Sequence, residues 1–181
     1  MIQIYEPIPG ENFELCHPER GDDFETLKVQ INGVPRCLTW RPISVQLVHD
    51  DEGRERVVSD SPWLDAHALI FRKSAITKLA GLLEEHGELL PLSCSEAELF
   101  VFNPTRVLDA LDEQSSAMLR FSDGGIMYIS RYVFRPEVVA GNHIFKIPNR
   151  RASPVFWDES AVRAWASAGL RGLEFKKVWS G

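Results

Sequence analysis

The last forty residues of this chain place the tightest limits on its fold. From Ile144 to Trp179 the sequence reads IFKIPNRRASPVFWDESAVRAWASAGLRGLEFKKVW. Two apolar runs, at 143–147 and 154–157, are separated by turn-forming residues and predict two strands. Asp158 is expected to cap a helix over about 158–168, Gly169 to end it, and 173–179 to form a last strand. This order of elements predicts an α+β domain.

A second helix is predicted over about 74–86. Its apolar residues recur at three- and four-residue spacing, which is typical of a helix with one buried face. They are Ile76, Leu79, Leu82 and Leu83. Ser74 is expected to be the N-cap, and Gly87 is expected to end the helix in a left-handed conformation. With short strands at 2–5, 68–71, 89–92 and 99–102, we expect a mixed, largely antiparallel sheet with two principal helices.

The sequence SDGG at 122–125 predicts a tight hairpin, because glycine permits the positive φ angles of such turns. The flanking strands are expected at 117–121 and 126–134. The second strand is apolar on both faces, which is typical of a central strand covered on both sides.

The first 60 residues are expected to form an acidic part rich in strands and loops, and residues 61–181 the core of one domain spanning 1–181. Residues 10–26 are polar and predict a loop, followed by a possible strand at 27–31. A strand at 45–48 leads into the turn-like DDEG at 50–53, with 56–58 as its returning strand.

The cysteine content and the amino terminus predict a cytoplasmic protein. Cys16, Cys37 and Cys94 are odd in number and widely spaced, which favours free thiols in a reducing compartment. The first 15 residues have neither the basic nor the apolar region of a secretory signal. No apolar run approaches the roughly 20 residues that span a bilayer, so we expect no membrane association.

Negative charge is concentrated in the first 25 residues, which hold seven acidic residues and one basic residue. Residues 120–181 instead hold ten basic and five acidic residues. An acidic front repels nucleic acid and attracts basic proteins, although it also serves simply as a solvated face. The basic tail lacks the interleaved aromatic residues of RNA-binding surfaces. A nucleic-acid partner is therefore not expected.

No sequence motif of an enzyme or a metal site is present. The five histidines are isolated, and neither a nucleophile elbow nor a phosphate-binding glycine loop occurs. We therefore expect no enzyme activity, no catalytic residue, no metal and no cofactor. Asp109, Asp112 and Glu113 form a carboxylate cluster. On a helical turn at 107–111 that ends at Asp112 the two aspartates share a face, where they either do acid–base work, bind a cation, or cap the turn and pair with an arginine such as Arg106.

Five segments, taken in order, resemble the pattern of a known family. They are LPL at 90–92, LFVFNPTRVLDALDEQSS at 99–116, HIFKIP at 143–148, PVFWDESAV at 154–162 and GLRGLEFKKVW at 169–179. The pattern is that of bacterial immunity protein family eleven, formerly a domain of unknown function, whose members occur beside polymorphic toxins. The resemblance extends over roughly residues 60–180 and rests on the order and spacing of fold-forming residues.

The resemblance implies a protein that binds and neutralises a cognate toxin in the producing cell. It carries over no catalytic residue and does not identify the toxin. Because many nuclease toxins are basic, we expect a basic partner that contacts acidic loops. The candidate contacts are Asp22, Asp23, Glu25, Asp50, Asp51 and Glu52. The alternatives are a small enzyme with a site at Asp109, Asp112 and Glu113, or a regulatory subunit of a larger assembly.

Overall fold

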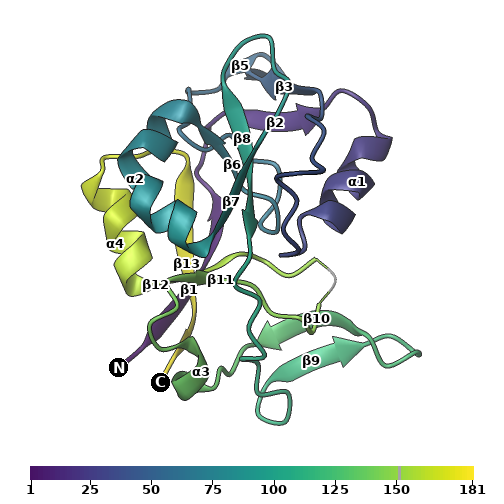
Figure 1. Ribbon diagram of the computed structural model, residues 1–181, viewed down its shortest axis with the longest axis vertical. Coiled ribbons are helices and arrows are strands. Elements are labelled where there is room, and N and C mark those ends of the chain that lie inside the picture. The colour runs from purple at the N-terminus through teal and green to yellow at the C-terminus, as the bar shows by residue number, and fades with distance from the viewer. Residues whose placement is uncertain (151) are drawn as a thin grey trace.

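A computed structural model describes residues 1–150 and 152–181 of the chain (Figure 1), apart from the side chains of Asp51 and Ala80. The helices are α1 (Asp22–Gln30), α2 (Lys73–His86), α3 (Pro136–Val139) and α4 (Glu159–Ser167). The strands of the amino-terminal half are β1 (Gln3–Pro9), β2 (Leu15–Pro18), β3 (Val45–Val48), β4 (Asp50–Asp51), β5 (Arg54–Glu55), β6 (Ile70–Arg72) and β7 (Gly87–Pro91). Those of the carboxy-terminal half are β8 (Leu99–Pro104), β9 (Ala117–Arg120), β10 (Ile126–Arg131), β11 (Ile144–Phe145), β12 (Phe156–Asp158) and β13 (Leu173–Ser180).

Two antiparallel sheets organise these elements. The first has the order β11-β12-β1-β13, and the second has the order β6-β8-β7. The amino-terminal strand β1 lies between two strands of the carboxy-terminal part: Tyr5 is opposite Trp157 of β12 on one side and Lys177 of β13 on the other. The predicted α+β fold is confirmed. Instead of one mixed sheet, however, the strands form several antiparallel sheets, and parallel pairing occurs in isolated bridges.

The alternation of side chains in β11 and β12 gives the first sheet two buried faces. Successive residues of a strand point to opposite faces, so Phe156 and Trp157 enter different cores. Ile144 and Phe145 of the neighbouring strand divide in the same way. All four side chains are fully buried. This explains why the sequence at these strands is a continuous apolar run.

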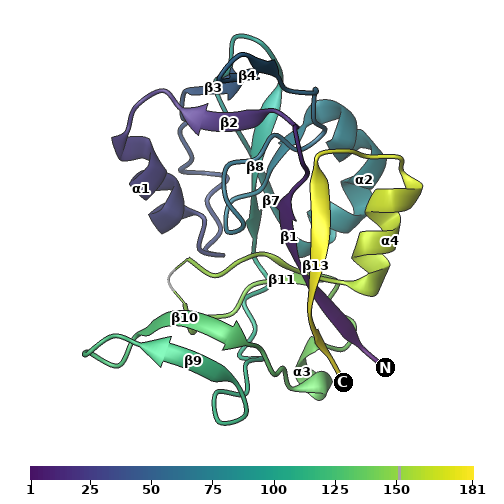
Figure 2. The same ribbon diagram turned by 180° about the vertical axis from the view of Figure 1, so that it is seen from behind.

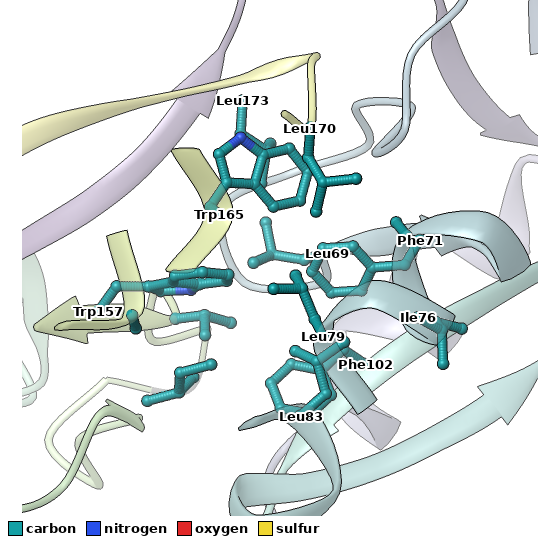
Figure 3. Close-up of a cluster of buried hydrophobic side chains, with 14 residues drawn as sticks. Leu69, Phe71, Ile76, Leu79, Leu83, Phe102, Trp157, Trp165, Leu170 and Leu173 are labelled. Atoms are coloured by element: carbon teal, nitrogen blue, oxygen red, sulfur yellow. The ribbon is translucent and has the colours of Figure 1, made fainter. Parts of the chain in front are cut away.

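The core on the Trp157 side joins the two sheets. Trp157 lies there with Trp165 of α4, and the α2 residues Leu79 and Leu83 and the β8 residue Phe102 complete the packing (Figure 3). The rings of Trp157 and Trp165 meet edge to face, with centroids 6.3 Å apart. Helices α2 and α4 lie next to each other on this side of the molecule (Figure 1). Both predicted principal helices are therefore present and share one core.

The second sheet also has two buried faces. Val101 of β8 points away from its neighbour Phe102 into a separate core, which is closed by Leu27 and Ile31. Leu27 is the buried residue of α1, and Ile31 is its C-cap. Because residues four apart share one helix face, this pair fixes α1 on the sheet. The predicted loop at 10–26 and strand at 27–31 were wrong over residues 22–30, where the chain forms α1.

Some of the predicted helix ends are confirmed, and others are wrong. Asp158 caps α4, its side chain accepting a hydrogen bond from the Ala161 N–H at 2.9 Å, and Gly169 follows the helix with φ +65°. Ser74 does not cap α2, because β6 runs directly into the helix and Arg72 occupies the N-cap position. Gly87 has an extended backbone that continues into β7. Its lack of a side chain matters because a Cβ there would lie 2.5 Å from the Asn103 carbonyl oxygen.

The described residues contain no helix that is both long and apolar enough to cross a membrane. All three cysteines are free thiols, as their number and spacing predicted; Cys16 is buried and Cys37 is exposed.

Lys146 links the amino-terminal and carboxy-terminal parts of the chain. Its ammonium group is buried directly after β11 and donates to the carbonyl oxygens of Ile31 at 2.5 Å and His67 at 2.6 Å. The Ile31 carbonyl lies at the end of α1, where the helix dipole favours a positive charge. Burial nevertheless lowers the pKa of Lys146 from 10.5 to about 7, because the charged form loses its hydration.

We expect the free energy of unfolding to rise with pH above about pH 7. Between pH 7 and 10.5 the unfolded chain keeps the Lys146 proton that the folded chain releases, and a state that binds fewer protons gains stability as pH rises. Wild type should gain on the order of 1.5 kcal/mol over Lys146→Met between about pH 7 and 8.5. Urea unfolding of both proteins at the two pH values measures this gain.

The matched control is Lys177→Met at an exposed position; it retains Lys146, so its free energy of unfolding should rise with pH in parallel with that of wild type. The window stops at pH 8.5 because burial raises the pKa of Cys16 to about 12, which lowers stability above about pH 9. If the free energies of unfolding of wild type and Lys146→Met differ by the same amount at both pH values, the prediction is contradicted.

Candidate interaction surfaces

The first group of predicted contact residues forms the first turn of α1. Asp22 and Glu25 are exposed, and Asp23 is half-buried. Carboxylates at this end of a helix are favoured by the positive end of the helix dipole, so these charges also stabilise α1. Their position on a helix rather than in a loop makes them a fixed negative surface.

The second group lies at the tip of the β4–β5 hairpin. Asp50 and Asp51 form β4, and its partner β5 begins already at Arg54, earlier than the return at 56–58 that the sequence predicted. Glu52 and Gly53 have φ +52° and +83°, as a two-residue hairpin turn requires. The Asp50 carboxylate accepts a hydrogen bond from the Gly53 N–H at 3.0 Å, while the side chain of Asp51 lies outside the described part. Glu52, the first residue of the turn, is exposed.

The structure does not bring the two acidic groups together. Strands β2 and β3 pair antiparallel, with Leu15 opposite Val48 and Pro18 opposite Val45. Helix α1 follows the Pro18 end of this ribbon, and β4 follows the Val48 end. The two groups thus leave the ribbon from opposite ends, about 10 Å apart along the strands. They form two separate acidic regions in the part of the molecule away from the chain termini (Figures 1 and 2).

The carboxylate cluster of the carboxy-terminal part is held by its neighbours. The segment at 107–111 does not form the predicted helical turn; Val107 bridges to Lys146 and Leu111 bridges to Phe134. Asp109 lies 3.2 Å from Arg135. Asp112 accepts hydrogen bonds from the N–H groups of residues 114 and 115, at 3.0 and 3.1 Å.

The hydrogen bonds to Asp112 and Glu113 favour the ionised forms of these two carboxylates. Hydrogen bonding from Ser115 holds the pKa of Asp112 below its usual value. Arg120, whose Nη2 lies 2.6 Å from the carboxylate, is the main cause that lowers the pKa of Glu113, and Asn149 adds a second hydrogen bond. A general acid needs a raised pKa near neutrality, which is the opposite of this arrangement. Within the described residues, no group of His, Cys, Asp and Glu side chains could hold a metal ion.

The hairpin of β9 and β10 is the surface that the sequence interpretation missed. The predicted turn is confirmed, with Gly124 at φ +88°, but β10 is paired with β9 alone and is not a central strand. One face of the hairpin packs on the core, where Ile129 is buried. The other face exposes Leu119 and its cross-strand partner Tyr128, by 62% and 54%. The apolar periodicity of the sequence did not indicate that this second face is exposed to solvent.

The irregular pairing of β10 contributes to this exposed face. The register shifts between Ile126 and Tyr128, so that Met127 is an extra residue opposite the β9 strand. A bulge of this kind bends a strand and re-aims its side chains. Met127 and Phe121 are exposed by 47% and 51%. The hairpin projects from the body of the molecule, at the end opposite to β4–β5 (Figures 1 and 2).

Replacement of Asp112 by alanine should lower the melting temperature by roughly 2–4 °C, since two backbone N–H groups lose their acceptor. Asp112→Asn is the control, because its side-chain oxygen retains the hydrogen bonds and should preserve most of the melting temperature. Differential scanning calorimetry of the three proteins measures the effect. An unchanged melt combined with loss of a biological function would instead assign Asp112 to a site.

The carboxy-terminal half of the chain matches a known family. The model of the immunity protein family Imm11 matches residues 92–180, which run from the end of β7 to the end of β13. The match starts about 30 residues later than the extent of roughly 60–180 inferred from the sequence. No curated protein sequence matches the chain.

The matched family is described as a family of immunity proteins. The match contains the β9–β10 hairpin and the carboxylate cluster, while the two acidic regions at 22–25 and 50–52 lie outside it. The resemblance is thereby confirmed: over residues 92–180 the chain is similar to the Imm11 family of immunity proteins.

Proposed function

We propose that this protein binds a cognate bacterial toxin and neutralises it in the cytoplasm of the cell that produces both. The family match over residues 92–180 is the observation that carries the proposal. The arrangement at Asp109, Asp112 and Glu113 supports binding over catalysis, because each carboxylate is engaged in holding its own segment. The enzyme alternative therefore gains no support from the geometry.

The proposed partner is a basic toxin protein, and the two acidic regions are its proposed contacts. Opposite charges accelerate the encounter of two proteins, and fixed charges on a helix or a tight turn are better placed for this than charges on a flexible segment. Asp22, Glu25, Asp50 and Glu52 are exposed, and both acidic regions belong to the same end of the molecule (Figure 1). No nucleic acid, membrane or cofactor is required for such a mechanism.

Co-expression should rescue cells from the product of the neighbouring gene. We expect that product to kill cells when expressed alone, and to be harmless and to co-purify in a one-to-one complex when this chain is present. Counting surviving cells measures the rescue. Phe156→Asp is the negative control, because a charge at this fully buried position prevents folding. A harmless neighbour, or a toxic one without rescue, would contradict the proposal.

Reversal of the charge of the acidic regions should slow association with the toxin. We expect Asp22→Lys, Asp23→Lys and Glu25→Lys together to lower the association rate about tenfold at low salt, and less at high salt. Because the two acidic regions are separate, Asp50→Lys, Asp51→Lys and Glu52→Lys together test the second acidic region independently. Stopped-flow association measures both rates.

The control for this experiment is Glu84→Lys with Glu85→Lys, which reverses two exposed charges on α2. Circular dichroism checks that α1 still forms after its first turn has become basic. Association rates that are indifferent both to the reversals and to salt would remove the two acidic regions from the interface.

A further inference from the structure

The outer face of the β9–β10 hairpin is a concentrated apolar surface that the fold does not use. Of the twelve large hydrophobic side chains exposed in the described residues, four lie within the ten residues from Leu119 to Tyr128. Single exposed apolar residues are normal on a protein surface, whereas a contiguous group marks a contact site. The hairpin is held in place by its inner face, through buried Ile129 and partly buried Met118 and Ile126.

A basic groove adjoins this apolar surface and shares Tyr128 with it. The groove has a volume of about 260 Å³ and is lined by Arg131, Arg150, Lys176 and Lys177 together with Tyr128 and Tyr132. Glu6 contributes one negative charge against these four positive charges. Among the side chains that the structure describes, no carboxylate forms an ion pair with any of the four cations. Glu6 attracts Lys176 and Arg150 electrostatically, but the groove keeps a net positive charge that a partner can meet.

We infer that the hairpin and the groove together dock the toxin, through a toxin segment that presents apolar side chains flanked by carboxylates. This inference rests on the proposed function. Apolar side chains of the partner would cover Leu119, Met127 and Tyr128, and its carboxylates would enter the groove. Tyrosine at the centre of such a surface is typical of residues that dominate binding energy.

This surface is distinct from the two acidic regions. They lie at the opposite end of the molecule and attract positive charge, whereas the groove attracts negative charge (Figures 1 and 2). A toxin segment at the groove therefore has the reverse charge of the basic surface that the acidic regions attract. The two sets of contacts can be tested separately on the same complex.

The test is the affinity of the full chain for a catalytically inactive toxin, measured by isothermal titration calorimetry. Leu119→Ser with Tyr128→Ser should weaken binding at least tenfold without changing the melting temperature, because both side chains are exposed. Lys176→Glu with Lys177→Glu should also weaken binding, and added salt should diminish that difference.

Matched controls carry equivalent changes elsewhere. Val57→Ser with Val58→Ser alters two side chains exposed by 46% and 57%, and Lys73→Glu with Arg171→Glu reverses two exposed charges. Both controls should bind like wild type. If wild type binds the toxin and the hairpin and groove variants bind it with the same affinity, the inference is overturned and the proposed function stands.

Two further outcomes distinguish this inference from the proposed function. If wild type itself forms no complex with the toxin, the proposed function fails, and the inference fails with it. If the chain alone is a dimer by light scattering and the hairpin variants are monomers, the surface belongs to a second copy of this chain. That result would also overturn the assignment of the surface to the toxin.

Discussion

The structure depends on the division of β12 between two cores. Phe156 and Trp157 are adjacent, fully buried and directed to opposite faces of the same sheet. Replacing either ring by alanine in such a core typically costs about 3–5 kcal/mol, a large part of the stability of a domain. The Trp157 face aligns α2 and α4 and joins the second sheet, and the Phe156 face supports the β9–β10 hairpin. The exposed face of the hairpin is thus positioned through β12.

Two buried polar side chains connect the amino-terminal part to this framework. Glu14 is fully buried and accepts hydrogen bonds from Arg72 and from the Ser59 N–H, and buried Lys146 reaches carbonyl groups of α1 and of the segment before β6. A buried charge that loses its partner is strongly destabilising. We therefore propose that the chain unfolds as one domain.

The sequence was most informative where local chemistry determines structure. The Asp158 cap, the Gly169 stop and the Gly124 turn were predictable because each depends on one side chain and its neighbours. Helix α1 was not, since its acidic first turn resembles a loop and Leu27 and Ile31 reveal a helix face only when both are seen against the sheet. The outer face of β10 was missed because an apolar strand does not show which of its faces is covered. The candidate contact residues of the first group lie on a helix rather than in the expected loop, and the distance between the two groups depends on the β2–β3 pairing, which the sequence does not reveal.

The extent of the family match has a structural consequence. Residues 92–180 contain β11, β12 and β13, but in the sheet β12 and β13 are separated by β1, which lies outside the match. Without β1, backbone N–H and C=O groups of β12 and β13 lose their hydrogen-bond partners. Buried backbone groups without partners are rare in stable folds. The matched region therefore needs a strand from outside it to close its sheet. In this chain the residues outside the match complete the scaffold on which the hairpin and groove are displayed, and they also hold the acidic regions at the other end.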